Sequence, residues 1–207
     1  MATGQRQSDC AYEQIKKMIV HMEFLPGSLV SEAGLMERLN VGRTPLREAI
    51  LRLVGENLIE IAPRRGYFIA DVSVTNFTYA QEFRQHLECI SARLAAIRAT
   101  EKNVKDLEDF IGYAEQGMNT DNFIWHIETD HEFHRLVAAA SGNPFLRDDI
   151  EQMYNLIIRQ YYLSRTPMTL VQSEISIYRL VVDAIKKHDS DEAELGMRAH
   201  LKLQKET

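Results

Sequence analysis

The stretch from Leu39 to Val54 constrains the fold of this chain more than any other. Its apolar residues recur at helical spacing and form one face of a helix. They are Leu46, Ala49, Ile50 and Leu53. Thr44 is expected to cap this helix and Pro45 to take its first position, where a missing N–H costs nothing. The sequence therefore predicts a helix that begins near Pro45 and ends near Asn57.

The polar residues at the start of this helix lie off its apolar face. Arg43, Thr44 and Arg47 place two guanidinium groups and a hydroxyl group around a helix N-terminus, where exposed backbone N–H groups already favour phosphate. The second helix of a helix-turn-helix has this arrangement, because its N-terminal end enters the major groove of DNA. The alternative is an ordinary capped amphipathic helix with two solvated arginines.

The flanking sequence favours the helix-turn-helix. A short helix over 31–39 is expected upstream, followed by a tight turn at 40–42. Downstream, 58–61 and 67–70 read as two strands, and Pro63–Gly66 between them forms a basic hairpin tip. Helix, helix, turn, helix and basic hairpin in that order describe a winged helix. The wing tip is where further phosphate or minor-groove contacts would fall.

The chain is expected to be mainly α and to form two domains. Residues 1–72 form an N-terminal winged helix-turn-helix with a small β wing, which begins with a polar tail to about Ser8. Residues 73–76 form a linker, and 77–207 form an antiparallel all-α bundle. Helical periods in the bundle are expected at about 76–99, 103–117, 120–140, 144–164, 171–187 and 190–204.

The net charge of −6 is unevenly distributed along the chain. Residues 1–72 carry 9 Lys+Arg and 9 Asp+Glu, whereas residues 73–207 carry 15 and 21. From Arg43 to Arg65 there are 5 basic and 3 acidic residues. We therefore expect a small positive footprint on double-stranded DNA, strengthened by dimerisation and weakened by salt.

The cysteine content and the hydropathy bound the compartment. Cys10 and Cys89 are too few for a disulfide framework. No stretch approaches the ~20 apolar residues of a membrane span, and the start of the chain lacks the pattern of a secretory signal. The expected location is the cytoplasm.

A few polar residues fall on the apolar stripes of the expected bundle. Asp130 and His134 lie four residues apart on the inward face of one helix, and His200 lies on the inward face of the last helix. Buried polar groups cost free energy unless they find partners. A shared metal ion would satisfy all three residues. The alternative is that each is a satisfied core residue, with Asp130 paired to a neighbouring His or Arg.

Three segments of the first domain resemble, in register, the consecutive signatures of the GntR family of bacterial transcription regulators. They are Phe24–Leu29, Val41–Ala49 and Arg65–Phe68. The resemblance implies that Arg43, Thr44, Arg47 and Gly66 belong to the DNA-contacting surface, and Pro45, Arg64 and Arg65 complete the candidates. The chain departs from the family at Gly42, which is often Ser or Thr, and at Ala33, which is Arg in some members.

The second domain resembles the FCD-type ligand-binding domain of the FadR branch of this family. The matching segments are Glu82–Glu88, Asp130–Leu136, Ala140–Leu146 and Ala184–Leu201. Such domains are all-helical and dimeric, and commonly hold a divalent ion such as Zn or Ni with one Asp and three His. Asp130, His134 and His200 match three of these ligands. Tyr178 stands at the fourth position.

This departure affects the expected ligand chemistry. A phenol with an unperturbed pKa of about 10 is a much poorer ligand than imidazole at neutral pH. Tyr178 is therefore expected either to weaken metal binding or to bind an effector directly. Arg84, with Glu88 one turn on, would suit a small carboxylate, although an Arg84–Glu88 ion pair explains both residues equally well. Arg159 is a weaker effector candidate.

These observations predict a ligand-responsive transcription regulator that is not an enzyme. We expect a repressor that binds a pseudo-palindromic operator as a homodimer and senses a small organic acid in its helical domain. One alternative is an all-α metalloenzyme that uses Asp130, His134 and His200, although no general base or nucleophile accompanies them. Another is a DNA-binding protein without an effector.

Overall fold

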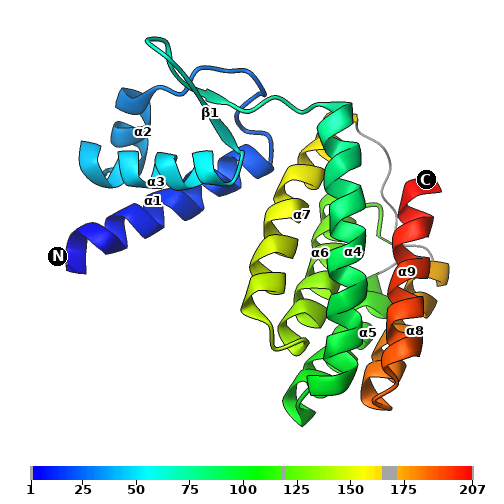
Figure 1. Ribbon diagram of the computed structural model, residues 1–207. Coiled ribbons are helices and arrows are strands. Elements are labelled where there is room, and N and C mark those ends of the chain that lie inside the picture. The colour runs from blue at the N-terminus through cyan, green and yellow to red at the C-terminus, as the bar shows by residue number, and fades with distance from the viewer. Residues whose placement is uncertain (1, 118–119, 165–171, 207) are drawn as a thin grey trace. The chain divides into compact units, whose positions relative to one another are not determined.

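The structure is a computed structural model that describes residues 2–117, 120–164 and 172–206 (Figure 1). The chain divides into two compact units. One comprises Met1–Phe77 and Asn155–Arg165, and the other comprises Thr78–Tyr154 and Thr166–Thr207. None of the helices in the described ranges combines the length and apolar character needed to cross a bilayer.

The fold is mainly α, as the sequence predicts. The first elements are α1 (Ala2–Val20), α2 (Glu32–Leu39), α3 (Arg43–Gly55), β1 (Ile59–Ala62) and β2 (Gly66–Ile69). The others are α4 (Val74–Arg98), α5 (Glu101–Gly117), α6 (Phe123–Ala140), α7 (Pro144–Ser164), α8 (Gln172–Lys186) and α9 (Ser190–Glu206). The six helices expected after the winged domain are confirmed to within a few residues. The expected start of one of them, residue 171, lies outside the described residues.

The apolar face predicted on α3 forms the centre of the winged-helix core. Leu46, Ala49, Ile50 and Leu53 are buried. They pack in one cluster with Ile15 and Ile19 of α1, Leu35 of α2, and residues of both strands. The helical spacing of these residues therefore fixes which side of α3 faces the core and which side faces solvent.

The start of α3 differs from the expectation. The N-cap residue is Gly42, with no side-chain hydrogen bond, and the helix begins at Arg43. The predicted capping role of Thr44 is wrong, because the first intrahelical bond runs from Leu46 N to Gly42 O at 3.2 Å and places Thr44 inside the first turn. The expected first position of Pro45 is wrong as well: Pro45 is the third residue of the helix, still in the turn whose N–H groups have no intrahelical partner.

The expected polar tail to Ser8 is also wrong for the described residues. Helix α1 begins at Ala2, and the side chain of Ser8 is buried. Asp9 accepts a hydrogen bond at 2.7 Å from Nη1 of Arg52 on α3. The hydrogen bond between Asp9 and Arg52 ties this part of α1 to α3, which stabilises a longer first helix than the sequence predicts.

The two strands form the predicted wing. They pair antiparallel from Ile59 opposite Ile69 to Ala62 opposite Gly66. Gly66 has φ +108°, a backbone conformation that other residues rarely adopt, so a glycine is required where the tip re-enters β2. The segment before α2 runs along the other edge of β2, where Val30 N donates to Tyr67 O at 2.8 Å.

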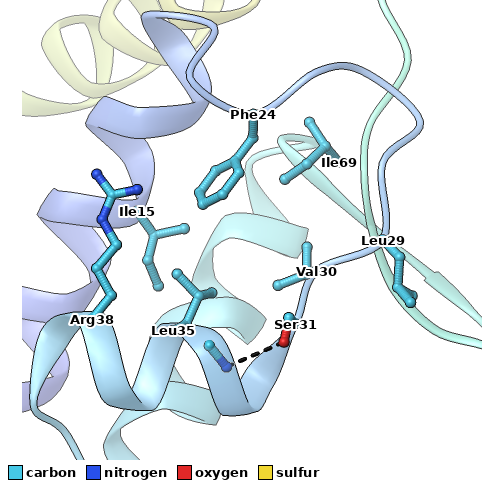
Figure 2. Close-up of a pocket in the computed structure, with 9 residues that line it drawn as sticks. Ile15, Phe24, Leu29, Val30, Ser31, Leu35, Arg38 and Ile69 are labelled. Carbon is cyan, nitrogen blue, oxygen red and sulfur yellow. Dashed lines mark hydrogen bonds between the residues drawn. The ribbon is translucent and has the colours of Figure 1, made fainter.

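A hollow of about 160 Å³ lies within the winged unit (Figure 2). Its apolar lining comes from α1, α2, β2 and the segment before α2, with Ile15, Leu35 and Ile69 among the residues. The figure also shows the cap of α2, in which Gly34 N donates to Ser31 Oγ at 3.1 Å. The cap fixes the first turn of α2, and therefore the backbone position of Glu32, the first residue of the helix.

The second unit is a helical bundle whose core joins α4, α5, α6, α8 and α9 (Figure 1). Helices α8 and α9 approach closely at Gly196, where a Cβ atom would lie 2.6 Å from Leu180 Cδ2 and 2.8 Å from Val181 Cγ2. Within this bundle, inward positions of α4, α6, α8 and α9 carry polar side chains. Those positions define the second site below.

Candidate DNA-binding face and metal site

The first candidate site is the N-terminal end of α3. Arg43, Thr44 and Arg47 are exposed there, whereas Pro45 is half-buried beside them. All four lie in the first five residues of the helix, so they flank the free backbone N–H groups of its first turn. The arrangement can bind phosphate and can also present a guanidinium group to a base edge.

Arg47 is not free in the described structure. Its Nε donates to Glu32 Oε2 at 3.0 Å, and its Nη2 donates to Glu32 Oε1 at 3.4 Å. These hydrogen bonds raise the pKa of Arg47, so the group stays charged. Glu32 was missed by the sequence reasoning. An acidic residue directly after the cap of the first helix of a helix-turn-helix would have been the signal.

The wing tip holds the remaining candidates for DNA contact. Arg64, Arg65 and Gly66 are all exposed. Arg64 has φ +62°, which turns the chain at the tip, and the guanidinium of Arg65 lies over the Phe68 ring, 5.4 Å from its centroid. The backbone conformation therefore places Arg64 at the turn, and the contact with the Phe68 ring positions the guanidinium group of Arg65.

The second candidate site gathers Asp130 and His134 of α6 with His200 of α9. All three residues are buried. The Nε2 atoms of the imidazoles lie 3.1 Å apart, and Asp130 Oδ1 lies 3.2 Å from that of His200 and 3.5 Å from that of His134. The structure therefore brings together the residues that the sequence singled out as ligands.

This triangle has the dimensions of a metal site. Zinc-bound nitrogen and oxygen atoms lie about 2.0–2.2 Å from the ion, so neighbouring ligand atoms lie about 3 to 3.5 Å apart. The three measured separations fall in this range, and two imidazoles with one carboxylate are suitable donors for a divalent ion. The chemistry and spacing of the three residues therefore fit a divalent metal ion.

Tyr178 reaches the same triangle from α8. Its hydroxyl donates to Asp130 Oδ1 at 2.8 Å, and its ring stacks on Phe133 with the centroids 4.0 Å apart. Burial and the Asp130 carboxylate raise the pKa of Tyr178 well above its ordinary value. Tyr178 therefore remains a phenol and acts as a hydrogen-bond donor.

Helix α4 adds a second buried pair. Arg84 Nε donates to Glu88 Oε1, and Glu88 Oε2 lies against His134 Nδ1. The second contact is close, but it lacks ordinary hydrogen-bond geometry. Arg84 Nη2 is 4.0 Å from Asp130 Oδ2. Arg84 therefore forms the expected ion pair with Glu88, and the Nη2 end of its guanidinium faces Asp130 of the triangle.

The charges of this cluster depend on one another. Burial alone would raise the pKa values of Glu88 and Asp130, but Arg84 and His134 hold that of Glu88 below its usual value, and the two imidazoles hold that of Asp130 well below. Burial opposes protonation of both imidazoles. It lowers the pKa of His200, whereas the nearby Glu88 carboxylate raises that of His134.

On the helices that carry this cluster, several buried polar atoms besides those of the Glu88–His134 contact make no hydrogen bond within the described residues. They are Arg84 Nη2 and Ser91 Oγ on α4, Thr129 Oγ1 on α6 and His200 Nδ1 on α9. Unsatisfied buried groups are rare in folded proteins and call for an ordered water, an ion or a ligand. Thr129 was not a candidate from sequence, because it precedes Asp130 without any motif of its own.

Arg159, the remaining effector candidate, belongs to the first unit. It is buried, and its Nη2 donates to the carbonyl oxygen of Ala70. Burial lowers the pKa of Arg159 to about 10. In the described structure this guanidinium therefore binds backbone at the end of the winged domain.

Comparisons with known proteins agree with this architecture. The model of the gntR family of bacterial regulatory proteins matches residues 7–69, and that of the FCD domain matches residues 80–203. The HTH-type transcriptional repressor RspR of Escherichia coli K12 is 30% identical over 194 residues, which cover 92% of this chain and 83% of that protein. NanR of Enterobacter sp. (strain 638), also a transcriptional repressor, is 31% identical over 217 residues, covering 94% and 82%.

A solved structure shows the same fold. E. coli McbR/YncC superposes with a TM-score of 0.81 at 21% identity, covering 96% of this chain and 94% of that one. A winged helix-turn-helix joined to a helical ligand-binding domain defines a ligand-responsive, DNA-binding transcription regulator. The chain belongs to the GntR family, in the branch that carries an FCD domain. Because this family consists of regulators, the metalloenzyme alternative is set aside.

Proposed function

We propose that this protein is a cytoplasmic repressor. It binds a pseudo-palindromic operator as a homodimer through α3 and the wing, and it senses a small organic acid beside a divalent ion in the bundle. The observation that carries the sensing part is the buried triangle of Asp130, His134 and His200, with edges of 3.1 to 3.5 Å. RspR and NanR are named as repressors, which supports the direction of control.

The exposed arginines support the assignment of the DNA face. Arg43 and Arg47 stand at a helix N-terminus and Arg64 and Arg65 at the wing tip, and none of the four is buried. Such groups contribute most of the electrostatic attraction to DNA and some of its sequence readout. Thr44 adds a hydroxyl donor beside Pro45 in the first turn of α3, and Gly66, which has no side chain, lets the backbone of the wing approach phosphate.

An exposed apolar stripe on α4 supports the dimer. Tyr79, Phe83, Ile90 and Ile97 follow one another at intervals of four and seven residues, and 49 to 63% of each is exposed. Such intervals keep side chains on one face of a helix, so the stripe offers a continuous apolar surface. A second copy of the chain suits it, because a two-fold dimer also matches two operator half-sites. Ile90→Glu should yield monomers in sedimentation velocity, whereas Phe145→Glu, at another exposed apolar residue, should not.

The charges of the cluster indicate the class of effector. When both imidazoles are neutral, as binding a metal ion requires, Arg84 carries one positive charge against the two carboxylates of Glu88 and Asp130. A divalent ion reverses the net charge from −1 to +1, and one added carboxylate then neutralises the buried site. Arg84 Nη2 is the group placed to orient such an acid, because the one O–H of Tyr178 is already donated to Asp130. Zn and Ni both accept this nitrogen and oxygen donor set.

The residues of the chain have separate roles in this proposal. The triangle would hold the ion, which supplies a positive charge and open coordination positions for a carboxylate. Tyr178 keeps Asp130 oriented, and the Glu88 carboxylate contacts Nδ1 of His134, the ring nitrogen that does not face the triangle. Arg159 has no role at this site. Effector binding can alter operator affinity only if the effector binds the DNA-competent and incompetent arrangements unequally.

A binding experiment tests the proposal in both parts. Operator duplexes are selected from a random pool, and their dissociation constants are measured for the intact protein, Arg47→Ala and the control Arg38→Ala. Loss of Arg47 should weaken operator binding by about tenfold or more, as expected for one bidentate base contact. A panel of small carboxylates with and without Zn should then identify an acid that changes operator affinity. If no acid does so, the protein binds DNA without an effector.

A further inference from the structure

We infer that Glu32 determines how selectively this protein reads DNA, because it both aims Arg47 and lowers the attraction of Arg47 for phosphate. The inference rests on the proposed placement of α3 at the operator and adds a residue that does not itself have to touch DNA. Glu32 is thus a positioning and specificity-determining residue.

Glu32 holds the guanidinium group of Arg47 along the edge formed by Nε and Nη2. The carboxylate oxygens of Glu32 meet Nε and Nη2 of Arg47 at 3.0 and 3.4 Å, one oxygen to each nitrogen. A guanidinium group is planar and carries five N–H donors, so the Nη1 end and one hydrogen of Nη2 remain for a guanine or phosphate. The side chain of Arg47 is still 51% exposed, which leaves that end accessible.

The position of Glu32 is itself fixed. It is the first residue of α2, directly after Ser31, whose Oγ caps the helix by accepting from Gly34 N (Figure 2). Leu35, one turn further along α2, is buried in the core of the winged domain and lines its hollow. Rotation of α2 about its axis would therefore remove Leu35 from the core. The carboxylate therefore stands on a rigid element, and the flexible partner is the arginine.

The energetic consequence concerns DNA more than folding. An exposed ion pair adds little to stability, because water screens it. A long arginine side chain, however, loses rotamer freedom when it binds, and a pair that already restricts it reduces that loss. Glu32 should therefore favour the one orientation that fits a base edge and disfavour the many orientations that fit a phosphate.

The charge of Glu32 acts in the same direction. Non-specific binding comes almost entirely from cations that neutralise phosphates, and each such contact steepens the dependence of affinity on salt. A carboxylate within hydrogen-bond distance of Arg47 offsets its charge for this purpose. The next residue, Ala33, is uncharged and so adds no positive charge that would compensate Glu32. Glu32 therefore weakens binding to unrelated DNA.

The chain contains a matched control for this pair. Arg38 Nη2 donates to Glu23 Oε2 at 2.7 Å, which is also an exposed Arg–Glu pair separated by 15 residues and involving α2. Arg38 lies in the last turn of α2, whereas Glu32 lies in the first. Glu23→Gln removes the same kind of charge from the same domain without touching Arg47.

The experiment compares Glu32→Gln, Glu32→Asp and Glu23→Gln with the unaltered full chain. Dissociation constants are measured for the selected operator and for an unrelated duplex over a range of salt concentrations. In Glu32→Gln, the unrelated duplex should bind more tightly with a salt slope steeper by about one, while the operator binds more weakly, so discrimination falls by about tenfold. Glu32→Asp keeps the charge but is too short to hold both nitrogens, so it should lose operator affinity alone. Glu23→Gln should change neither constant.

Other outcomes overturn the inference. If Glu32→Gln tightens both duplexes equally, Glu32 only repels phosphate and does not aim Arg47. If it changes neither, the pair is a surface contact without a role in recognition. Failure of the proposed function looks different, because Arg47→Ala would then leave the preference for the operator intact. Circular dichroism melting of each variant confirms that the fold is retained.

Discussion

The hydroxyl of Tyr178 donates a 2.8 Å hydrogen bond to Asp130 Oδ1, the same oxygen that faces the Nε2 atoms of both buried imidazoles. A phenol that donates to a ligand oxygen orients this oxygen but also occupies one of its lone pairs. The raised pKa of Tyr178 keeps the proton in place. Tyr178 therefore orients a carboxylate oxygen of the proposed metal site and does not itself offer a fourth ligand.

This relationship predicts the effect of restoring an imidazole. Tyr178→His should raise the affinity for Zn by about tenfold or more, because it replaces a competing donor by a nitrogen ligand. The affinity is measured by competition with a chromophoric chelator. Tyr178→Phe is the control, since it removes the hydroxyl without adding a ligand. An unchanged affinity in Tyr178→His would mean that residue 178 does not converge on the ion.

Arg84 should be needed for the effector but not for the operator. Arg84→Lys keeps the positive charge beside Glu88, so the buried carboxylate stays compensated, but it loses the planar fork that holds a carboxylate with two hydrogen bonds. The response of operator binding to the effector should fall by about tenfold, while affinity without effector stays the same. Arg93→Lys, on the exposed side of α4, serves as the control. A full response in Arg84→Lys would limit Arg84 to the ion pair.

Two glycines should respond in opposite ways to the same substitution. Gly196→Ala places a methyl group 2.8 Å from Cγ2 of Val181, which is fully buried and stiff, so the free energy of unfolding should fall by about 1–3 kcal/mol. At Gly112 within α5, nothing lies within 4 Å of an added Cβ, so Gly112→Ala should stabilise by about 0.5–1 kcal/mol. Urea unfolding measures both. If Gly196→Ala is neutral, α8 and α9 do not pack as closely as described.

The buried charges predict a loss of stability in acid. Burial opposes ionisation of Glu88, but Arg84 and His134 outweigh it, so the pKa of Glu88 is lower in the folded chain than in the unfolded one. A lowered pKa contributes stability above the unfolded value of about 4, and this contribution is lost as the pH falls through the folded value. Glu88→Gln should therefore flatten the dependence of unfolding free energy on pH below about 5.

The control for this prediction is Glu48→Gln, at an exposed position of α3. It should leave the acid limb of the stability curve unchanged. Glu88→Gln also strands the Arg84 charge and should cost about 3–5 kcal/mol at neutral pH. The same acid limb in Glu88→Gln and in the unaltered protein would show that Glu88 is not ionised in the folded bundle.

The sequence predicted the elements well, because they depend on local periodicity. The apolar face of α3 and the helices of the bundle follow from spacing alone. The start of α3 was misplaced because Thr44 and Gly42 can both precede a first turn, and only the bond from Leu46 N to Gly42 O distinguishes them.

The site was harder to predict, because its contacts join distant parts of the chain. Helical spacing brought out Asp130, His134 and His200 as polar residues on apolar faces, and the family resemblance added Tyr178 at a fourth position. No local pattern shows that Glu88 meets His134 or that Glu32 meets Arg47, because packing between helices creates these pairs. Contacts of this kind depend on tertiary structure, which periodicity does not encode.

The most direct test of the account is a zinc titration of the metal-free protein, with nickel in parallel and His134→Ala as the control. If the triangle of Asp130, His134 and His200 is a metal site, one ion should bind per chain. The affinity should fall by at least about a hundredfold when His134 is removed, since a chelating ligand is lost. Equal binding by His134→Ala and the intact protein, or no binding by either, would contradict the account and leave the three residues as a hydrogen-bonded core cluster.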